Sequence, residues 1–285
     1  MTKRPKIVFQ GEPGANSDLA SRQAYRGHTP VPCATFEDCF AAVRSGKAHL
    51  AMIPIENSVA GRVADIHHLM PHSGLHIIAE HFMPVRHQLM APHGATVKSI
   101  KTVESHVHAL GQCRKIIRKL GVRAVVAADT AGSAREVAEA ADITRAAIAS
   151  KLAAKIYGLT ILKPNIEDEA HNTTRFIVLS KKANWAPNGR KHKIVTTFVF
   201  QVRNIPAALY KALGGFATNG INMTKLESYM VGGSFSATQF YADVEGHPDE
   251  RALELALEEL DFVCQRGTLK ILGVYPAHKM RKKFK

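Results

Sequence analysis

The sequence predicts an α/β protein in which two lobes are joined by two crossings of the chain and are followed by a smaller unit with the order βαββαβ. Short apolar segments typical of buried strands alternate with helix-like segments from residue 6 to residue 157. Strand-like segments return at residues 159–162 and 176–180, which takes the chain back to the first lobe. After residues 181–192, whose Asn, Pro and Gly residues are typical of a linker, a new pattern of strands and helices begins.

Length and composition indicate a globular protein with more than one domain. A chain of 285 residues is long for a single core, and 46% hydrophobic with 22% charged residues is the composition of a soluble protein. No apolar run is long enough to cross a membrane, and the first residues lead into a strand without the apolar core of a signal peptide. We therefore expect a cytoplasmic protein with no membrane partner.

The cysteines and histidines predict neither a disulfide framework nor a metal site. The 4 cysteines are scattered and form no Cys-x-x-Cys pair, so we expect them to be reduced. Of the 15 histidines, four lie close together in sequence, at positions 67, 68, 72 and 76. His68 and His72 would share a helix face, but Pro71 interrupts that helix and no second spacing motif accompanies them. We expect no metal.

The net charge of +14 is compatible with a nucleic acid, an acidic surface or a small anionic substrate. The sequence has no zinc finger, no helix-turn-helix signature and no aromatic RNA-binding consensus, so we expect no nucleic-acid partner. Attraction of a small dianionic substrate is enough to explain this positive charge. The basic residues that end the chain are expected to form a frayed, solvated tail.

The first lobe is predicted to consist of alternating strands and helices. Its elements are a strand over residues 6–10, a helix over 18–25, a helix over 35–45, a strand over 49–55 and a helix over 59–69. Gly11 and Gly14 form a turn that lets the backbone approach a ligand, and Ser17 is expected to cap the helix that follows. The strand over 49–55 ends in three polar residues, Glu56, Asn57 and Ser58.

The second lobe repeats this alternation. Strands over 75–80 and 84–90 lead into it, and it is predicted to contain strands over 100–103, 122–128 and 146–149 and helices over 107–120, 131–141 and 151–157. Ser105, His106 and Ser150 lie where strands meet helices. Each is by default a helix cap, but ligands bind at the carboxyl ends of strands in open α/β sheets, so their recurrence at one edge predicts a cleft.

The segment around which the first two lobes are organised begins at Asn172. Asn172, Thr173, Thr174 and Arg175 directly precede a buried strand that starts at Phe176, so a rigid element presents them together. A guanidinium can bind a carboxylate through two hydrogen bonds, and a threonine hydroxyl can both donate and accept. This set suits an anionic substrate that carries a hydroxyl group. The arrangement is similar to the periplasmic-binding-protein type, with the Thr-Thr-Arg strand near the hinge.

The C-terminal unit is predicted to be ferredoxin-like. Its elements are a strand over 193–202, a helix over 206–217, strands over 221–229 and 235–244, a helix over 249–262 and a strand over 269–274. Gly232 and Gly233 predict a hairpin between the two central strands.

Three motifs resemble the prephenate dehydratase family with a C-terminal ACT regulatory domain. They are Asn-Thr-Thr-Arg-Phe at 172–176, Pro-Ile-Glu-Asn-Ser at 54–58 and Leu-Glu-Ser at 226–228, and the likeness extends from Ile7 to Pro276. The resemblance implies a catalytic domain over 1–182, with lobe 1 at about 1–80 plus 162–182 and lobe 2 at about 81–161. A linker over 183–192, an ACT domain over 193–276 and a basic tail over 277–285 would follow.

The resemblance further implies decarboxylation and dehydration of prephenate to phenylpyruvate, without a metal or organic cofactor. Thr174 would donate a proton or hydrogen bond, Thr173 and Asn172 would orient it, and Arg175 would either anchor a carboxylate or tie the lobes together. The expected substrate-binding residues are Glu56, Asn57, Ser58, Ser17, Ser105, His106, Ser150 and Phe176. Ala15 and Asn16 depart from the family, which has a hydroxyl and an aromatic residue there.

An ACT domain implies a phenylalanine effector and assembly into a homodimer or homotetramer. By this resemblance, the residues that contact the effector would be Asn204, Ala207, Ala208, Leu209, Asn222, Glu227 and Ser228. Ala207 stands where the family has glycine, and Tyr229-Met230 stand where it has Arg-Pro. A purely oligomerising domain is the alternative.

Two other functions compete with this interpretation. A cytosolic two-lobed sensor would bind a solute without converting it, and an amino-acid-responsive regulator would use the positive charge to bind nucleic acid. Within the dehydratase interpretation, both prephenate and arogenate remain open as substrates.

Overall fold

The computed structural model describes residues 4–189, 193–230 and 237–283. Contacts between residues divide the chain into two compact units. One consists of residues 1–63 and 81–176, and the other of residues 64–80 and 177–285. The segment 64–80, which was expected in the first lobe, therefore makes its contacts mainly with the C-terminal half of the chain.

The first unit begins with a parallel sheet in which β1 lies between β2 and β3. The elements are β1 (Lys6–Gln10), α1 (Asn16–Ala24), β2 (Thr29–Cys33), α2 (Phe36–Arg44), β3 (Leu50–Asn57) and β4 (Gly61–Arg62). The sequence did not predict β2, which contains two prolines. Pro30 and Pro32 are tolerated because β2 lies at the edge of the sheet, where a missing backbone donor costs least.

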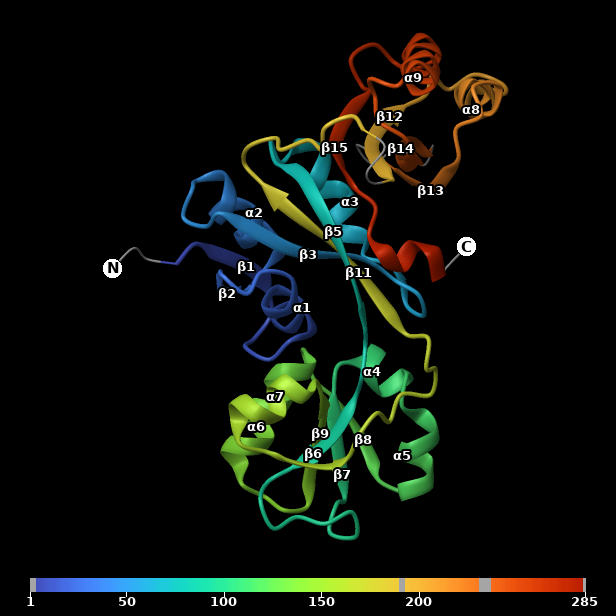
Figure 1. Cartoon of the computed structure of the whole chain (residues 1–285). Helices are drawn as coiled ribbons and strands as arrows, with labels where there is room; N and C mark the ends of the chain where they lie inside the picture. The colour runs from blue at the N-terminus through green and yellow to red at the C-terminus, as the bar shows by residue number, and fades with distance from the viewer. Residues whose placement is uncertain (1–3, 190–192, 231–236, 284–285) are drawn as a thin grey trace. The chain divides into compact units, whose positions relative to one another are not determined.

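A separate five-stranded sheet forms the second lobe, in the order β10-β6-β9-β7-β8. Its elements are β6 (Gln88–Ala91), β7 (Thr102–Ser105), α4 (Val107–Gly111), α5 (Arg114–Leu120), β8 (Arg123–Val126), α6 (Thr130–Ala140), β9 (Arg145–Ala149), α7 (Lys151–Tyr157) and β10 (Thr160–Lys163). Helices cover both faces (Figure 1). Ile148 packs with the residues of α4, while its neighbour Ala147 packs with those of α6 and α7, which explains why β9 is apolar from residue 146 to residue 149.

The helix predicted over 107–120 is wrong in one respect, since it is two helices separated by Gln112 and Cys113. Asp168, from a distant segment, accepts hydrogen bonds from the Lys115 backbone N–H at 3.2 and 3.3 Å and so caps the start of α5. The Asp168 backbone N–H donates to the Gln112 carbonyl at 2.6 Å. Long-range hydrogen bonds thus replace the bonds of a continuous helix at this point.

Two other predicted helix starts are wrong. The helix predicted from residue 59 begins only with α3 (Ala64–Leu69), because the Asn57 side chain takes up the N–H groups of residues 59 and 60 and Gly61 has φ of 83°. Ser17 lies inside α1 and does not cap it. The residue before α1 is Ala15, and Asp18 instead accepts from the Gly14 N–H at 2.9 Å.

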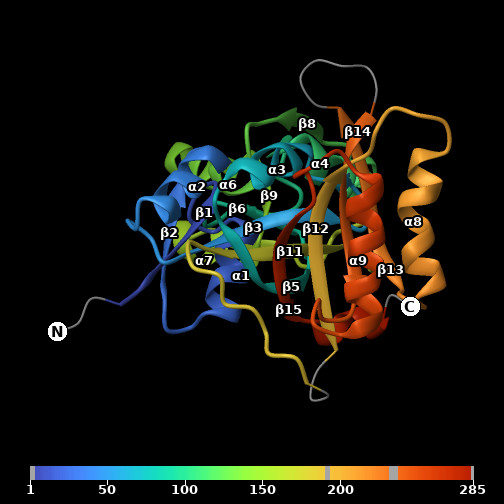
Figure 2. The same ribbon diagram turned by 90° about the horizontal axis from the view of Figure 1, so that it is seen from above.

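The second unit contains the βαββαβ order that the sequence predicted. Its sheet has the order β13-β14-β12-β15-β5, and α8 and α9 lie side by side against it (Figure 2). The elements are α3, the 3-10 turn η1 (Met70–His72), β5 (His76–Pro84), β11 (Thr173–Ser180), β12 (Ile194–Gln201), α8 (Ala208–Thr218), β13 (Met223–Met230), β14 (Ala237–Glu245), α9 (Arg251–Val263), β15 (Lys270–Pro276) and η2 (Lys279–Lys283). The unit boundary falls within β5 and β11. The turn expected at Gly232 and Gly233 lies outside the described residues.

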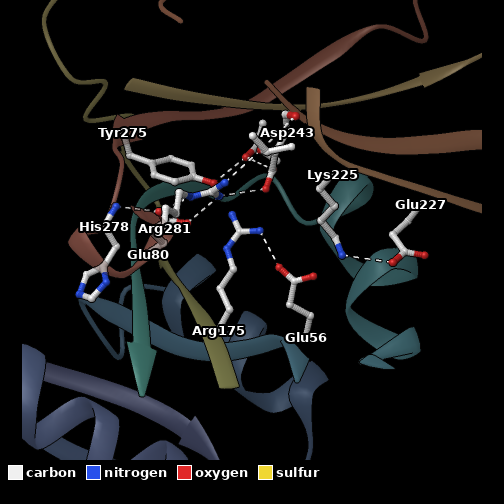
Figure 3. A network of polar contacts seen from close by, with 11 residues as sticks. Glu56, Glu80, Arg175, Lys225, Glu227, Asp243, Tyr275, His278 and Arg281 are labelled. Carbon is white, nitrogen blue, oxygen red and sulfur yellow. Dashed lines mark hydrogen bonds and ion pairs between the residues drawn. The ribbon is translucent and has the colours of Figure 1, made fainter. Parts of the chain in front are cut away.

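Up to residue 283, where the described part of the chain ends, the C-terminal tail is not the frayed end that the sequence predicted, because Arg281 is held by a buried polar cluster (Figure 3). Its guanidinium bonds both oxygens of the Glu80 carboxylate, at 2.6 and 2.8 Å, and reaches the Asp243 carboxylate at 3.2 Å. The Glu80 and Asp243 side chains are both 0% exposed. A charge-assisted pair with two bonds therefore ties η2 to β5 and β14.

The residue before helix α8 has a strained backbone conformation. It begins at Ala208 and not at Pro206, and Ala207 at its start has φ of 60°, a conformation that favours glycine. The Cβ atom of alanine is penalised there by about 1–2 kcal/mol. The departure from the family's glycine at this position therefore has a cost in stability.

Ala207→Gly is expected to raise the free energy of unfolding by about 1 kcal/mol, because glycine adopts this φ without the steric penalty. Urea denaturation measures the change. Ala212→Gly is the matched control, since Ala212 lies in the interior of the same helix and should be destabilised by a similar amount or more. Equal losses at both positions would contradict the strain.

Candidate functional site

The carboxyl end of β3 and the start of β11 lie together, and this brings two of the predicted motifs into contact. The Ser58 N–H donates to the Thr173 carbonyl at 2.9 Å, and the Thr173 N–H donates to the Ser58 hydroxyl at 3.0 Å. These reciprocal bonds fix the register of the two segments. Asn57 is thereby placed beside Asn172 and Thr174, as expected of residues that form one site.

Asn57 is oriented by the backbone that follows it. Its Oδ1 atom accepts from the N–H groups of Val59 and Ala60 at 3.0 and 2.8 Å. Since a backbone N–H can only donate, the identity of this oxygen is fixed, and the Nδ2 group must point the other way. Nδ2 donates both of its hydrogens, to Asn172 Oδ1 at 2.8 Å and to Thr174 Oγ1 at 2.9 Å.

The chain of amides continues to Gln112. Because Asn172 accepts through Oδ1, its Nδ2 is a donor, and it bonds Gln112 Oε1 at 2.7 Å. His87 Nε2 lies 2.9 Å from the same Oε1, so this ring nitrogen must carry a proton. We call Asn57, Asn172, Thr174, Gln112 and His87 the amide relay.

Two hydrogen-bond donors of the amide relay are not bonded to other members of the relay. Thr174 accepts from Asn57, which leaves its hydroxyl hydrogen available. Gln112 accepts twice through Oε1, which leaves its Nε2 group available. Both residues are half-buried, so a ligand can reach them. The site therefore offers neutral, preoriented donors, which suit an oxygen that gains negative charge during a reaction.

Arg175 and Glu56, both predicted site residues, form an ion pair at 2.9 Å (Figure 3). The guanidinium lies 5.9 Å from the centre of the Phe82 ring, and Arg175 is only 2% exposed. Both residues of the pair belong to the first unit. Arg175 is thus buried and held, directly beside Thr174, in a salt bridge whose carboxylate partner is partly exposed.

The predicted serines at the helix starts have different positions. Ser150 caps α7 and also donates to the Gly14 carbonyl at 2.5 Å, so it joins the two lobes. Ser105 is fully buried and donates to the Ile148 carbonyl at 2.6 Å within its own sheet. His106 caps α4 through Nδ1. Ser17 lies buried in α1, and Phe176 is buried in β11.

The two residues that the sequence interpretation missed are Gln112 and His87. Gln112 was hidden inside a helix that was predicted to be continuous, and His87 inside a predicted strand. Gly111, directly before Gln112, was the one local sign of a helix end.

The predicted effector residues lie in the second unit. Asn204, Ala207, Ala208 and Leu209 surround the start of α8, Glu227 and Ser228 lie on β13, and Asn222 precedes β13 and donates to Glu245 at 3.3 Å.

The histidines that cluster in the sequence are not grouped around a common centre with other ligands within the part of the chain that the structure describes. His67, one of these histidines, packs with its ring centre 5.0 Å from that of Tyr241. Among the described residues, no three His, Cys, Asp or Glu side chains are grouped so as to hold a metal ion. No helix in the same residues is both long and apolar enough for a membrane span.

Gly14→Ala is expected to destabilise the protein by about 3 kcal/mol, because an added Cβ would lie 2.7 Å from the Ala153 Cα atom of the other lobe and Gly14 has φ of 93°. Thermal unfolding and the KM for the substrate measure the effect, and KM should rise. Gly158→Ala is the control, since it also has positive φ but no atom within 4 Å, and it should cost about 1 kcal/mol. Equal effects would refute the lobe contact.

The fold and the amide relay together define a class of protein, a two-lobed α/β enzyme whose site presents neutral hydrogen-bond donors beside a strand that links the lobes. Residues 7–184 match the profile of the family described as prephenate dehydratase. The chain belongs to the prephenate dehydratase family, and it is a lyase.

Relatives of known function agree with this assignment. A bifunctional N-acyl-homoserine lactone acylase/prephenate dehydratase of Komagataeibacter europaeus is 52% identical over 97% of this chain and 98% of its own. The chloroplastic arogenate dehydratase/prephenate dehydratase 2 of Arabidopsis thaliana is 36% identical over 96% of this chain and 73% of its own. The crystal structure of prephenate dehydratase in complex with L-Phe from Arthrobacter aurescens superposes with a TM-score of 0.87 at 30% identity, covering 95% of this chain and 90% of that one.

Proposed function

We propose that this enzyme converts prephenate to phenylpyruvate in the cytoplasm, as a step of L-phenylalanine biosynthesis. The observation that carries the proposal is the amide relay, which leaves the Thr174 hydroxyl and the Gln112 Nε2 group as donors. The site needs no redox chemistry for this reaction.

The chemistry of prephenate explains why such a site suffices. Prephenate carries two carboxylates and a ring hydroxyl. The ring carboxylate leaves as carbon dioxide and its bonding electrons enter the ring, while the hydroxyl group leaves from the opposite carbon and takes up a proton to become water. The product is aromatic, and this supplies the driving force. The enzyme has only to align the two leaving groups and stabilise the departing hydroxyl.

Thr174 is proposed to donate to that departing hydroxyl. A threonine alcohol is a weak acid at neutral pH, so its contribution is a preoriented hydrogen bond or the relay of a proton, and not full ionisation. Asn57 keeps the Thr174 oxygen occupied as an acceptor, so the hydroxyl hydrogen points away from Asn57. Gln112 is proposed to bind a carboxylate oxygen through Nε2, and the Arg175–Glu56 pair supports the strand that carries Thr174.

A steady-state assay of phenylpyruvate formation, followed by ultraviolet absorbance, tests this function. Turnover of prephenate supports it, and it also excludes a sensor that binds without conversion. Arogenate, which differs in the side chain and not in the ring, should be assayed in parallel, with phenylalanine as its product. Binding of both compounds without turnover of either would refute the proposal.

The second unit is proposed to be an ACT domain that binds phenylalanine and to assemble the chain into a homodimer or homotetramer. The proposal is supported by its βαββαβ order and by the resemblance of residues 204–209 and 226–228 to the family's effector site. The relative from Arthrobacter aurescens is described in complex with L-Phe. Calorimetric titration with phenylalanine and the inhibition of turnover test it, and light scattering gives the mass of the assembly. Absence of both binding and inhibition would refute it.

A second candidate function is hydrolysis of N-acyl-homoserine lactones. The observation in its favour is 52% identity to the bifunctional relative from Komagataeibacter europaeus over nearly the full length of both chains. Chromatographic detection of free homoserine lactone after incubation with the purified protein tests it. An acylase that uses the amide relay should lose this activity in Thr174→Ala, whereas a separate site should not.

A further inference from the structure

His87 is a buried histidine beside the proposed substrate site that has no role in the chemistry described above. It is 3% exposed, and its Nε2 atom lies 2.9 Å from Gln112 Oε1. It follows β5 and directly precedes β6, so it lies on one of the two segments that connect the lobes. From this crossing its side chain reaches Gln112, which lies between α4 and α5.

The other crossing holds the backbone of His87. The His87 N–H donates to Glu167 Oε2 at 3.0 Å, and the His87 carbonyl accepts from the Ile166 N–H at 2.9 Å. Arg86 pairs with the second oxygen of Glu167 at 2.7 Å. These bonds fix the backbone of His87, and the bond to Gln112 orients its imidazole ring.

The proton on His87 is set by the direction of the amide relay. Gln112 Oε1 accepts from Asn172 and carries no hydrogen of its own, so a nitrogen within hydrogen-bond distance of it must be a donor. That donor is His87 Nε2–H. Burial lowers the pKa of His87, so the ring is neutral at neutral pH with Nδ1 bare.

We propose that His87 is a positioning residue that locks the Gln112 amide so that its Nε2 group faces the substrate. The proposal rests on the proposed function, because Gln112 acts there as a substrate-binding donor. Without His87, only Asn172 would hold Oε1, and the Gln112 amide could rotate about its last side-chain bond. A rotated amide would present an oxygen in place of a donor to the substrate carboxylate, which is repulsive.

The test compares His87→Leu, which removes the donor at similar volume, with His87→Gln, whose amide nitrogen can replace Nε2–H. We expect His87→Leu to lower kcat/KM for prephenate by about tenfold or more, and His87→Gln to restore most of it. His247→Leu is the matched control. His247 is also a buried histidine with a hydrogen-bonded Nε2 atom, but its partner is the Ala186 backbone carbonyl and it lies in the second unit. This variant should lose stability without losing activity.

A double-mutant cycle separates positioning from a general structural role. If His87 acts only through Gln112, then His87→Leu combined with Gln112→Leu should be no slower than Gln112→Leu alone, within about twofold. If the losses in kcat/KM of the two single variants multiply in the double variant, or if His87→Leu is fully active, the inference is wrong. The proposed function still stands in either case, provided that the wild-type protein turns over prephenate. 15N NMR of the imidazole provides a readout without substrate. A protonated Nε2 supports the inference even if prephenate is not turned over, and a protonated Nδ1 contradicts it.

Discussion

Thr174→Ala is expected to lower kcat for prephenate by about a hundredfold or more, since removal of a single preoriented donor commonly has an effect of this size. The Thr174 hydroxyl accepts from Asn57 at 2.9 Å and is left with one hydrogen to donate. Alanine removes that hydrogen without disturbing the backbone bonds of β11. The folded state and the mass of the assembly should therefore be unchanged.

Two controls sharpen this prediction. Thr174→Ser keeps the hydroxyl and should retain much of the activity, although serine is free to adopt more rotamers. Thr173→Ala removes the neighbouring hydroxyl, which donates to the His171 carbonyl at 3.0 Å and is not part of the amide relay, so its loss should be much smaller. Near-normal turnover of pure prephenate by Thr174→Ala would refute the assignment.

Arg281→Ala is expected to destabilise the second unit by about 3–5 kcal/mol, the usual cost of removing one partner from a buried ion pair. The guanidinium is the shared partner of two carboxylates that are 0% exposed, those of Glu80 and Asp243. Asp243 also accepts from the Thr197 hydroxyl at 2.6 Å, which in turn lies 2.6 Å from the Tyr275 hydroxyl. The substitution therefore disturbs a connected polar network and not a single contact.

Chemical denaturation measures the effect of Arg281→Ala, and Arg251→Ala is the matched control. Arg251 also pairs with a carboxylate, that of Glu254 at 2.9 Å, but its side chain is 71% exposed. Exposed pairs contribute about 0–1 kcal/mol, so this control should be close to wild type. If both substitutions have the same small effect, the C-terminal residues are not anchored as described.

The parts of the site that the sequence predicted are those in which local pattern and position agree. Asn57 ends one strand and Thr174 is the second residue of another, and the carboxyl end of the first strand lies next to the start of the second. Their family motifs pointed to the same place. The alternation of strands and helices in both lobes was likewise readable, because buried strands such as β3 and β9 contain short runs of apolar residues.

What the sequence did not reveal depends on contacts between distant segments. Gln112 enters the site because Asp168, which is 53 residues from Lys115, caps the start of α5 and ends the preceding helix early. Arg281 is ordered because it pairs with Glu80, 201 residues away. No local pattern encodes either partner. Ser17 was misassigned for a different, local reason, since the Asp18 carboxylate accepts from the Gly14 N–H just before the helix.

The most direct measurement of the central claim is the rate of phenylpyruvate release by Asn57→Asp. Aspartate keeps an oxygen for the N–H groups of Val59 and Ala60, but it replaces the Nδ2 donor by an acceptor. The Thr174 hydroxyl should then turn to donate to it and away from the substrate. If the amide relay orients Thr174, the kcat of Asn57→Asp should fall by about tenfold or more with the fold intact. Turnover at the wild-type rate would contradict this role of the amide relay.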